Sequence, residues 1–91
     1  MENPKNQTAE VLYTLLNYDF ITRTSIMQMA GILNVTARIA DLRIRYGVNV
    51  TCENIHTKNK FSRPISFGSW SIKGELERKK AHEVYKKINR D

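Results

Sequence analysis

The sequence predicts an α+β fold, because the spacing of its apolar residues changes along the chain. Up to Gly47, and again after Gly74, apolar residues recur three and four positions apart, the period of a helix with one buried face. Between Val48 and Ile72 they recur about every second position, the period of half-buried strands. With 91 residues, 41% of them hydrophobic, the chain suits one small folded domain rather than a disordered basic tail.

Residues 1–6 form a polar arm that contains proline, and residues 7–91 are expected to form the domain. The first helix is expected over 7–17, with Asn6 or Thr8 as its N-cap. Its apolar face consists of Val11, Leu12, Leu15 and Leu16.

A second, short helix is expected next in the chain. Phe20-Ile21 is a candidate for a very short strand, and the run 22–25 offers two N-cap residues for the helix that follows it. Gly31 is expected to end this helix. The residues expected to face inward are Ile26, Met29 and Ala30.

The third helix, expected over 33–46, has the most regular spacing in the sequence. Its apolar positions are separated by 3, 4, 3 and 4 residues, which places them on one stripe, and Gly47 ends it. The stripe consists of Ile32, Val35, Ile39, Leu42 and Tyr46.

A β-hairpin is expected over 48–72, with a basic polar tip at 57–60 and a bulge or kink at Gly68. Cys52 is expected to be buried in the first strand and inert, and two aromatic residues of the second strand are expected in the core. These aromatic residues are Phe67 and Trp70.

The last helix is expected over 75–89. Acidic residues near its start and basic residues near its end complement the helix dipole. Its apolar face consists of Leu76, Ala81, Val84, Tyr85 and Ile88.

Two helices joined by a tight turn and followed by a β-hairpin make a winged helix-turn-helix, here with three helices, a two-stranded wing and a C-terminal helix. Such modules place the second helix of the pair in the major groove of DNA, where its side chains reach base edges. In this chain that helix is the one expected over 33–46. The wing would lie against the flanking backbone or the minor groove.

Four segments of the chain resemble a family of small winged helix-turn-helix DNA-binding domains found in bacteriophages and mobile elements. They are Ile21-Thr22-Arg23, Gly31-Ile32, Ala37-Arg38-Ile39-Ala40-Asp41-Leu42-Arg43 and Gly47-Val48-Asn49-Val50. The resemblance covers about a third of the chain. It implies a winged-helix fold and DNA binding, often in regulation or phage biology.

The positive charge lies in the middle of the sequence. The whole chain has a formal net charge of +6; residues 1–19 carry −2, residues 20–73 carry +6 and residues 74–91 carry +2. A basic segment mixed with Asn, Thr and Ser is typical of a surface that contacts a polyanion, although a solvated basic surface has the same composition.

Three residues at the start of the third helix are candidates for reading bases, namely Asn34, Thr36 and Arg38. The alternative for Asn34 and Thr36 is helix capping, and for Arg38 an ion pair with Asp41. Arg43 and Arg45 lie toward the helix end, where phosphate contacts are expected, and Arg43 has packing against the wing as its alternative.

Further phosphate contacts are expected at two places. Arg23 and Thr24 lie at the positive end of the second helix, with plain capping as the alternative for Thr24. Lys58, Lys60 and Arg63 lie on the wing, where the alternative is a solvated loop.

No enzyme is expected, because no set of catalytic residues, metal ligands or phosphate-binding glycines is visible, and no cofactor is expected. His56 and His82 stand without a ligand set. No apolar run approaches the roughly 20 residues of a membrane span, and no apolar leader follows Met1, so a cytoplasmic, nucleoid-associated location in a bacterial host is expected.

The expected function is therefore sequence-specific binding of double-stranded DNA, as a small transcriptional regulator or accessory factor. A homodimer through the last helix is a further possible partner arrangement. The alternative is a protein-interaction module on the same scaffold, such as a phage assembly or anti-host factor, which would show an exposed hydrophobic patch.

Overall fold

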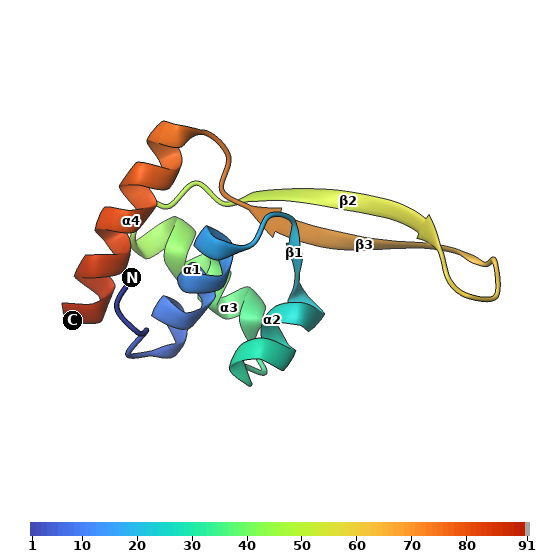
Figure 1. The fold of residues 1–91 in the computed structure, drawn as a ribbon, viewed down its shortest axis with the longest axis horizontal. Helices are drawn as coiled ribbons and strands as arrows, with labels where there is room; N and C mark the ends of the chain where they lie inside the picture. The colour runs from blue at the N-terminus through green and yellow to red at the C-terminus, as the bar shows by residue number, and fades with distance from the viewer. Residues whose placement is uncertain (91) are drawn as a thin grey trace.

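The helices pack together, and two strands of a three-stranded antiparallel sheet form a long hairpin that extends away from them (Figure 1). The computed structural model describes residues 1–90; Asp91, the last residue of the expected domain, lies outside the described residues. The elements are α1 (Gln7–Asn17), β1 (Ile21–Thr22), α2 (Arg23–Ala30), α3 (Val35–Ala40), a π-helical turn η1 (Asp41–Arg45), β2 (Thr51–Lys58), β3 (Pro64–Ser71) and α4 (Glu75–Arg90). This α+β arrangement is compatible with a winged-helix-like fold.

One apolar core joins the helices to the base of the sheet. The stripe predicted for the third helix is confirmed: Ile39 and Leu42 are buried, and Tyr46 packs against the core from its edge. α1 contributes Leu12 and Leu15, both completely buried. Burying side chains of this size stabilises the fold by about 1.5–3 kcal/mol each, so this cluster holds α1 and α3 together.

The start of α1 is confirmed at Gln7, with Asn6 as the N-cap whose side-chain oxygen accepts from the Ala9 N–H at 2.8 Å. α2 ends as expected at Gly31, whose φ of 68° lies in the left-handed region that glycine adopts without steric cost. The short strand β1 lies one residue later than expected. It pairs with β3 in the register Ile21↔Trp70 and Thr22↔Ser69.

The expectation that Met29 faces inward is wrong, since its side chain is 50% exposed. At 100° per residue, Ile26, Met27 and Ala30 share one side of α2, and position 29 points away from it. Met27 therefore packs against the core in place of Met29.

The third helix differs from the expected span of 33–46 at both ends. Its start moves to Val35, because the side chain of Asn34 caps it by accepting from the Ala37 N–H at 3.2 Å. Its last part is the π-helical turn η1, which ends with the Tyr46 N–H donating to the Asp41 carbonyl at 3.3 Å. Ile44 points to solvent, because it lies about 200° around the helix from the buried Leu42, outside the apolar stripe.

The β2–β3 hairpin is confirmed, but its details differ from the expectation. β2 begins at Thr51, after the buried Val48 and Val50, and the tip is the turn 59–63. The strand pairing runs without interruption from Thr51↔Ser71 to Lys58↔Pro64, so the predicted bulge at Gly68 is wrong.

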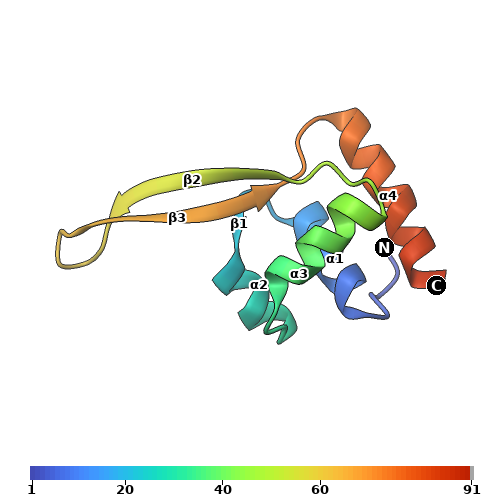
Figure 2. The same cartoon turned by 180° about the vertical axis from the view of Figure 1, so that it is seen from behind.

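Two burial expectations for the hairpin are also wrong. Cys52 is exposed at the base of the hairpin, on the edge strand β2 opposite Trp70. Phe67 is 40% exposed and lies farther out, along the hairpin that extends past the helices (Figure 2). Trp70, nearer the base, does pack against the core as expected.

The last helix, expected over 75–89, packs on α1 through Ala81, Tyr85 and Ile88 of its expected apolar face. Leu76 does not join this face and is 67% exposed, because it lies in the first turn, beyond the end of α1. The N-terminal arm packs on the same helix: the Tyr85 hydroxyl donates to the Glu2 carbonyl at 2.6 Å, and the Lys5 N–H donates to Asn89 Oδ1 at 3.0 Å.

Candidate nucleic-acid interface

A groove lies between the start of α2, the start of α3 and the middle of β3. It brings together two of the expected phosphate contacts and one expected base contact, which are far apart in the sequence. The groove is lined by Thr22, Arg23, Thr24, Thr36, Phe67, Gly68 and Trp70. Hydroxyl groups and a guanidinium therefore line its helical side, and aromatic rings line its β3 side.

At the start of α2 the capping role belongs to Thr22, not to Thr24. The Thr22 hydroxyl oxygen accepts from the Ser25 N–H at 3.1 Å and donates to Ser25 Oγ at 3.0 Å. Arg23 and Thr24 follow this cap with exposed side chains. The first backbone N–H groups of a helix lack partners within it, so this end of α2 favours an anion.

The three expected base contacts at α3 have different surroundings. Asn34 is the N-cap, so its alternative role is confirmed, and Thr36 is exposed on the groove. Arg38 lies with Nε 3.2 Å from Asp41 Oδ2, as its ion-pair alternative predicted. This contact is a charge interaction without hydrogen-bond geometry, because Arg38 Nε is buried with no hydrogen-bond acceptor among residues 1–90.

The two arginines of η1 are placed by neighbouring groups of the protein. Arg43 donates from Nε and Nη2 to the carbonyl of Val50, so the packing role considered for it is present. The guanidinium carbon of Arg45 lies 5.4 Å from the centre of the Tyr46 ring, a cation–π contact that leaves the side chain exposed.

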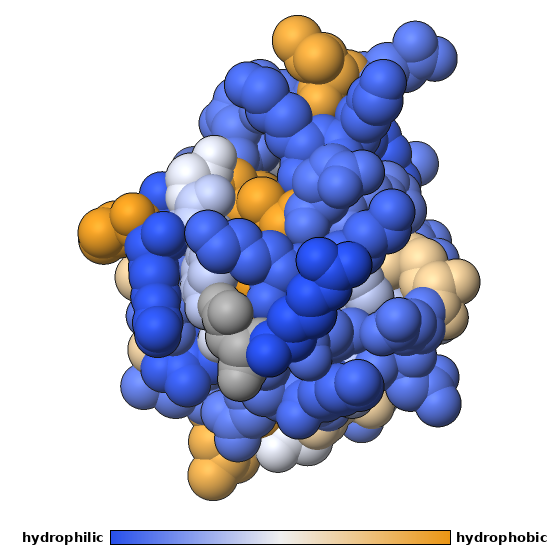
Figure 3. Space-filling view, turned by 90° about the vertical axis from the view of Figure 1, so that its left-hand side faces the viewer, coloured by the Kyte–Doolittle hydropathy of each residue, from blue (hydrophilic) through white to orange (hydrophobic). Residues whose placement is uncertain are grey.

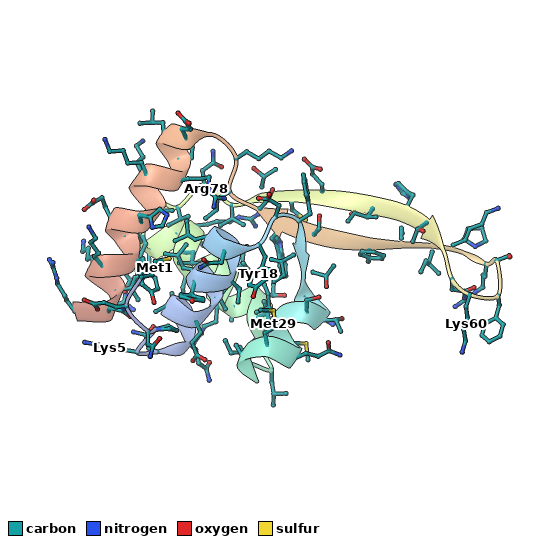
Figure 4. The ribbon with its side chains drawn as sticks, viewed as in Figure 1. Met1, Lys5, Tyr18, Met29, Lys60 and Arg78 are labelled. Carbon is teal, nitrogen blue, oxygen red and sulfur yellow. The ribbon has the colours of Figure 1, made fainter. Side chains whose placement is uncertain are left out.

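The tip of the hairpin carries the expected wing residues Lys58, Lys60 and Arg63. All three are exposed, and none forms an ion pair with a carboxylate of the described chain, 1–90. No acidic residue occurs between 54 and 68. Figure 4 shows Lys60 at the far end of the hairpin, well away from the helices. The tip is therefore a concentrated positive charge held at a distance from the core.

Three exposed apolar side chains near these sites were not predicted from the sequence. Phe61 lies at the hairpin tip and is 77% exposed, whereas Leu33 and Ile44 flank α3 and are 87% and 85% exposed. The sequence held a signal for the exposure of Phe61, because this aromatic residue lies inside the basic run 58–63, outside the alternation of apolar and polar residues that marks the strands. Ile44 also had a signal, because it lies outside the apolar stripe of the third helix, on the side that the stripe leaves exposed.

The surface of α4 bears on the expected homodimer. Its apolar residues Tyr85 and Ile88 are buried within the chain, and Leu76 is its large exposed apolar side chain. Figure 3 views the molecule from the side on which α4 and the N-terminal arm lie, and most of this face is hydrophilic. Pairing of this helix with a second copy stays a prediction.

No helix within residues 1–90 has the length and apolar character needed to cross a membrane. In the same described part of the chain, no group of three metal-ligating His, Cys, Asp or Glu side chains comes together. No protein-family model, curated protein or solved structure matches the chain.

Proposed function

We propose that this protein is a winged helix-turn-helix protein that binds double-stranded DNA, as a small transcriptional regulator or accessory factor of a phage or mobile element. α3 would lie in the major groove, and the hairpin would act as the wing. The observation that carries the proposal is the hairpin tip, where three basic side chains extend beyond the helices and have no carboxylate partner among residues 1–90.

The charge at the tip favours a phosphate backbone over a neutral partner. An exposed lysine or arginine without a partner gains most from a dense line of negative charges, such as the phosphates of a duplex. Lys73, which follows β3 at the base of the hairpin, differs from the three tip residues because it forms an ion pair with Glu53. The hairpin therefore presents its free charge only toward its tip.

The groove beside α3 supplies a second contact region for the same duplex. A phosphate at the start of α2 would meet the backbone N–H groups there and the exposed Arg23. A duplex held at that point places Thr36 of α3 next to its major groove. Thr36 and the exposed Ala40 suit contacts to thymine methyl groups, which a helix makes with small apolar side chains.

The proposal is tested by titrating a labelled 30-base-pair duplex with the full chain, by fluorescence anisotropy at two salt concentrations. A variant with Lys58→Ala, Lys60→Ala and Arg63→Ala is expected to lower the slope of log K against log salt by about 2.7, since each phosphate contact contributes about 0.9. The matched control removes three exposed lysines of α4, with Lys79→Ala, Lys80→Ala and Lys87→Ala. A wild-type chain that does not bind the duplex at low salt contradicts the proposal.

A second candidate function is a protein-interaction module, favoured by the exposed Leu33 and Ile44 beside α3. Isolated exposed apolar side chains are common, but two of them flanking one short helix suit a partner protein. The double variant Leu33→Ser and Ile44→Ser separates the two functions. It leaves the salt slope of duplex binding unchanged if the phosphates are held by the wing, and it abolishes binding of a partner that packs on α3.

A further inference from the structure

The exposed phenyl ring of Phe61 is unusual for its position. It is 77% exposed at the tip of the hairpin, the part of the described chain that extends farthest from the helices (Figure 1). Moving an aromatic ring out of water lowers the free energy, so a polar residue is favoured at a loop tip that stays in water. The ring therefore gives the tip an apolar surface that a partner can cover.

The backbone of the tip holds Phe61 in place. Asn59 Oδ1 accepts from the N–H groups of Phe61, at 2.9 Å, and of Arg63, at 3.0 Å. The Asn59 N–H donates to the Arg63 carbonyl at 2.9 Å, and Ser62 N–H donates to the Asn59 carbonyl at 2.9 Å. Four hydrogen bonds across five residues make this a built turn with Phe61 at its apex.

The apolar ring is surrounded by positive charge. Lys60 Nζ lies 5.1 Å from the centre of the Phe61 ring, and Lys58 and Arg63 are the nearest other charged residues in the chain. A partner must then offer an apolar surface framed closely by negative charges. Stacked bases bordered by phosphates on both sides have this chemistry, and the minor groove is where apolar side chains enter between them.

The length of the hairpin fits this placement. Strands of eight residues, β2 and β3, span about 25 Å at about 3.3 Å per residue. With α3 in the major groove, the adjacent minor groove lies half a helical turn away, about 17 Å along the duplex. The hairpin is therefore long enough to span the distance from α3 in the major groove to the adjacent minor groove.

We propose that Phe61 inserts as a wedge between neighbouring base pairs in the minor groove of a DNA duplex, while Lys58, Lys60 and Arg63 hold the phosphates on either side. This proposal rests on the duplex binding proposed above. Partial unstacking of one base step bends the duplex toward the major groove, and the bend turns the flanking duplex toward the rest of the protein.

The test measures bending separately from binding. A 30-base-pair duplex with a central TpA step, which unstacks easily, carries a donor and an acceptor dye at its two ends. The full-length wild type is expected to shorten the distance between the dyes. Phe61→Ala is expected to bind about tenfold more weakly, with the salt slope unchanged, and to abolish the shortening. Phe61→Leu, which keeps an apolar wedge, is expected to retain part of it.

A second readout follows the ring itself. In Phe61→Trp, stacking of the indole on bases is expected to quench tryptophan emission on duplex addition, with the wild type reporting the background from Trp70. The matched control Leu76→Ala removes another exposed apolar side chain, on α4, and is expected to change neither bending nor affinity. Thermal unfolding of each variant confirms that it folds.

The outcomes separate the two proposals. Absence of duplex binding by the wild type overturns the proposed function itself. Duplex binding with equal bending by the wild type and Phe61→Ala, or without quenching in Phe61→Trp, overturns the wedge and leaves the proposed function standing. Tighter binding of the wild type to single-stranded DNA, or to vesicles of anionic lipid, with loss in Phe61→Ala, also overturns the duplex wedge.

Discussion

Arg43 holds the carbonyl of Val50 with two N–H groups, from Nε at 3.2 Å and from Nη2 at 2.8 Å. This pair ties the π-helical end of the third helix to the last residue before β2. This contact therefore adds to the pairing of β1 with β3 in fixing the direction in which the hairpin leaves the helices. A planar guanidinium suits this role, because its donors are fixed relative to one another.

Arg43→Ala is expected to lower the free energy of unfolding by about 1–2 kcal/mol, because a carbonyl inside the fold loses two charged donors. Urea denaturation followed by circular dichroism measures the change. Arg45→Ala is the matched control, since its guanidinium only contacts the Tyr46 ring, and about 0.5 kcal/mol is expected there. Equal losses in the two variants would contradict this account of Arg43.

Asn34→Ala is expected to destabilise the fold by about 1 kcal/mol, because the Ala37 N–H loses the cap that starts α3. Asn34→Asp keeps an acceptor at the same position and is expected to restore most of the loss. Thermal unfolding of the three proteins gives the comparison. A loss that Asn34→Asp does not recover would show that the amide acts in some other way.

Arg38 and Asp41 give a test of base reading within the proposed DNA-binding function. Arg38→Ala is expected to reduce the difference in binding free energy between a preferred duplex and one with a changed base pair by about 1–3 kcal/mol, the contribution of one bidentate base contact. Asp41→Asn is expected to strengthen duplex binding, because it frees Arg38 and removes a negative charge 3.2 Å from it. Duplexes obtained by selection from a random library supply the sequences for anisotropy titrations.

A different result for this pair is also informative. Unchanged discrimination in Arg38→Ala, together with a loss of stability, would assign Arg38 to the ion pair alone. The expected loss of stability from the pair is small, about 0.2–0.5 kcal/mol for neighbours on a helix surface. Urea denaturation of the same variant measures it.

Tyr85 predicts a dependence of stability on alkaline pH. Burial raises the pKa of Tyr85 above its ordinary value of 10.0, against a smaller lowering by its hydrogen bond with Asn89. Because the folded state holds the proton more tightly, stability is complete below about pH 10 and falls as the pH rises from there toward the folded pKa. Tyr85→Phe is expected to show a shallower fall, measured by urea denaturation between pH 8 and about 11. Parallel curves for the two proteins would contradict this.

Much of the helical part of the fold was predictable, because its signals are local. The stripe from Ile32 to Tyr46 and the left-handed Gly31 each depend on residues within one or two turns. The start of α3 at Val35 was harder to predict from the sequence, because Asn34 had two candidate roles, as a helix cap and as a base contact. Because Asn34 is a cap, it lies outside the helix, whereas the apolar spacing alone predicts a helix that includes it.

The hairpin was less predictable, since burial there depends on how far the strands run beyond the helices. Phe67 and Trp70 carry the same kind of side chain three residues apart, yet only Trp70 reaches the core. For Arg43 the sequence left two roles open, a phosphate contact and packing against the wing, and the contact with Val50 shows the second. Exposure of Phe61 follows from the same projection.

The hydrogen bonds between the N-terminal arm and α4 bear on the order in which the chain folds. Glu2 and Lys5 meet Tyr85 and Asn89, residues separated from them by 83 and 84 positions. During synthesis, the arm has no partner until residues 85–89 have left the ribosome, whereas α1, α2 and α3 can pack before then. Contacts with so large a sequence separation carry the highest cost of loop closure. The arm is thus expected to dock last, and its amide protons to exchange with solvent before those of α1.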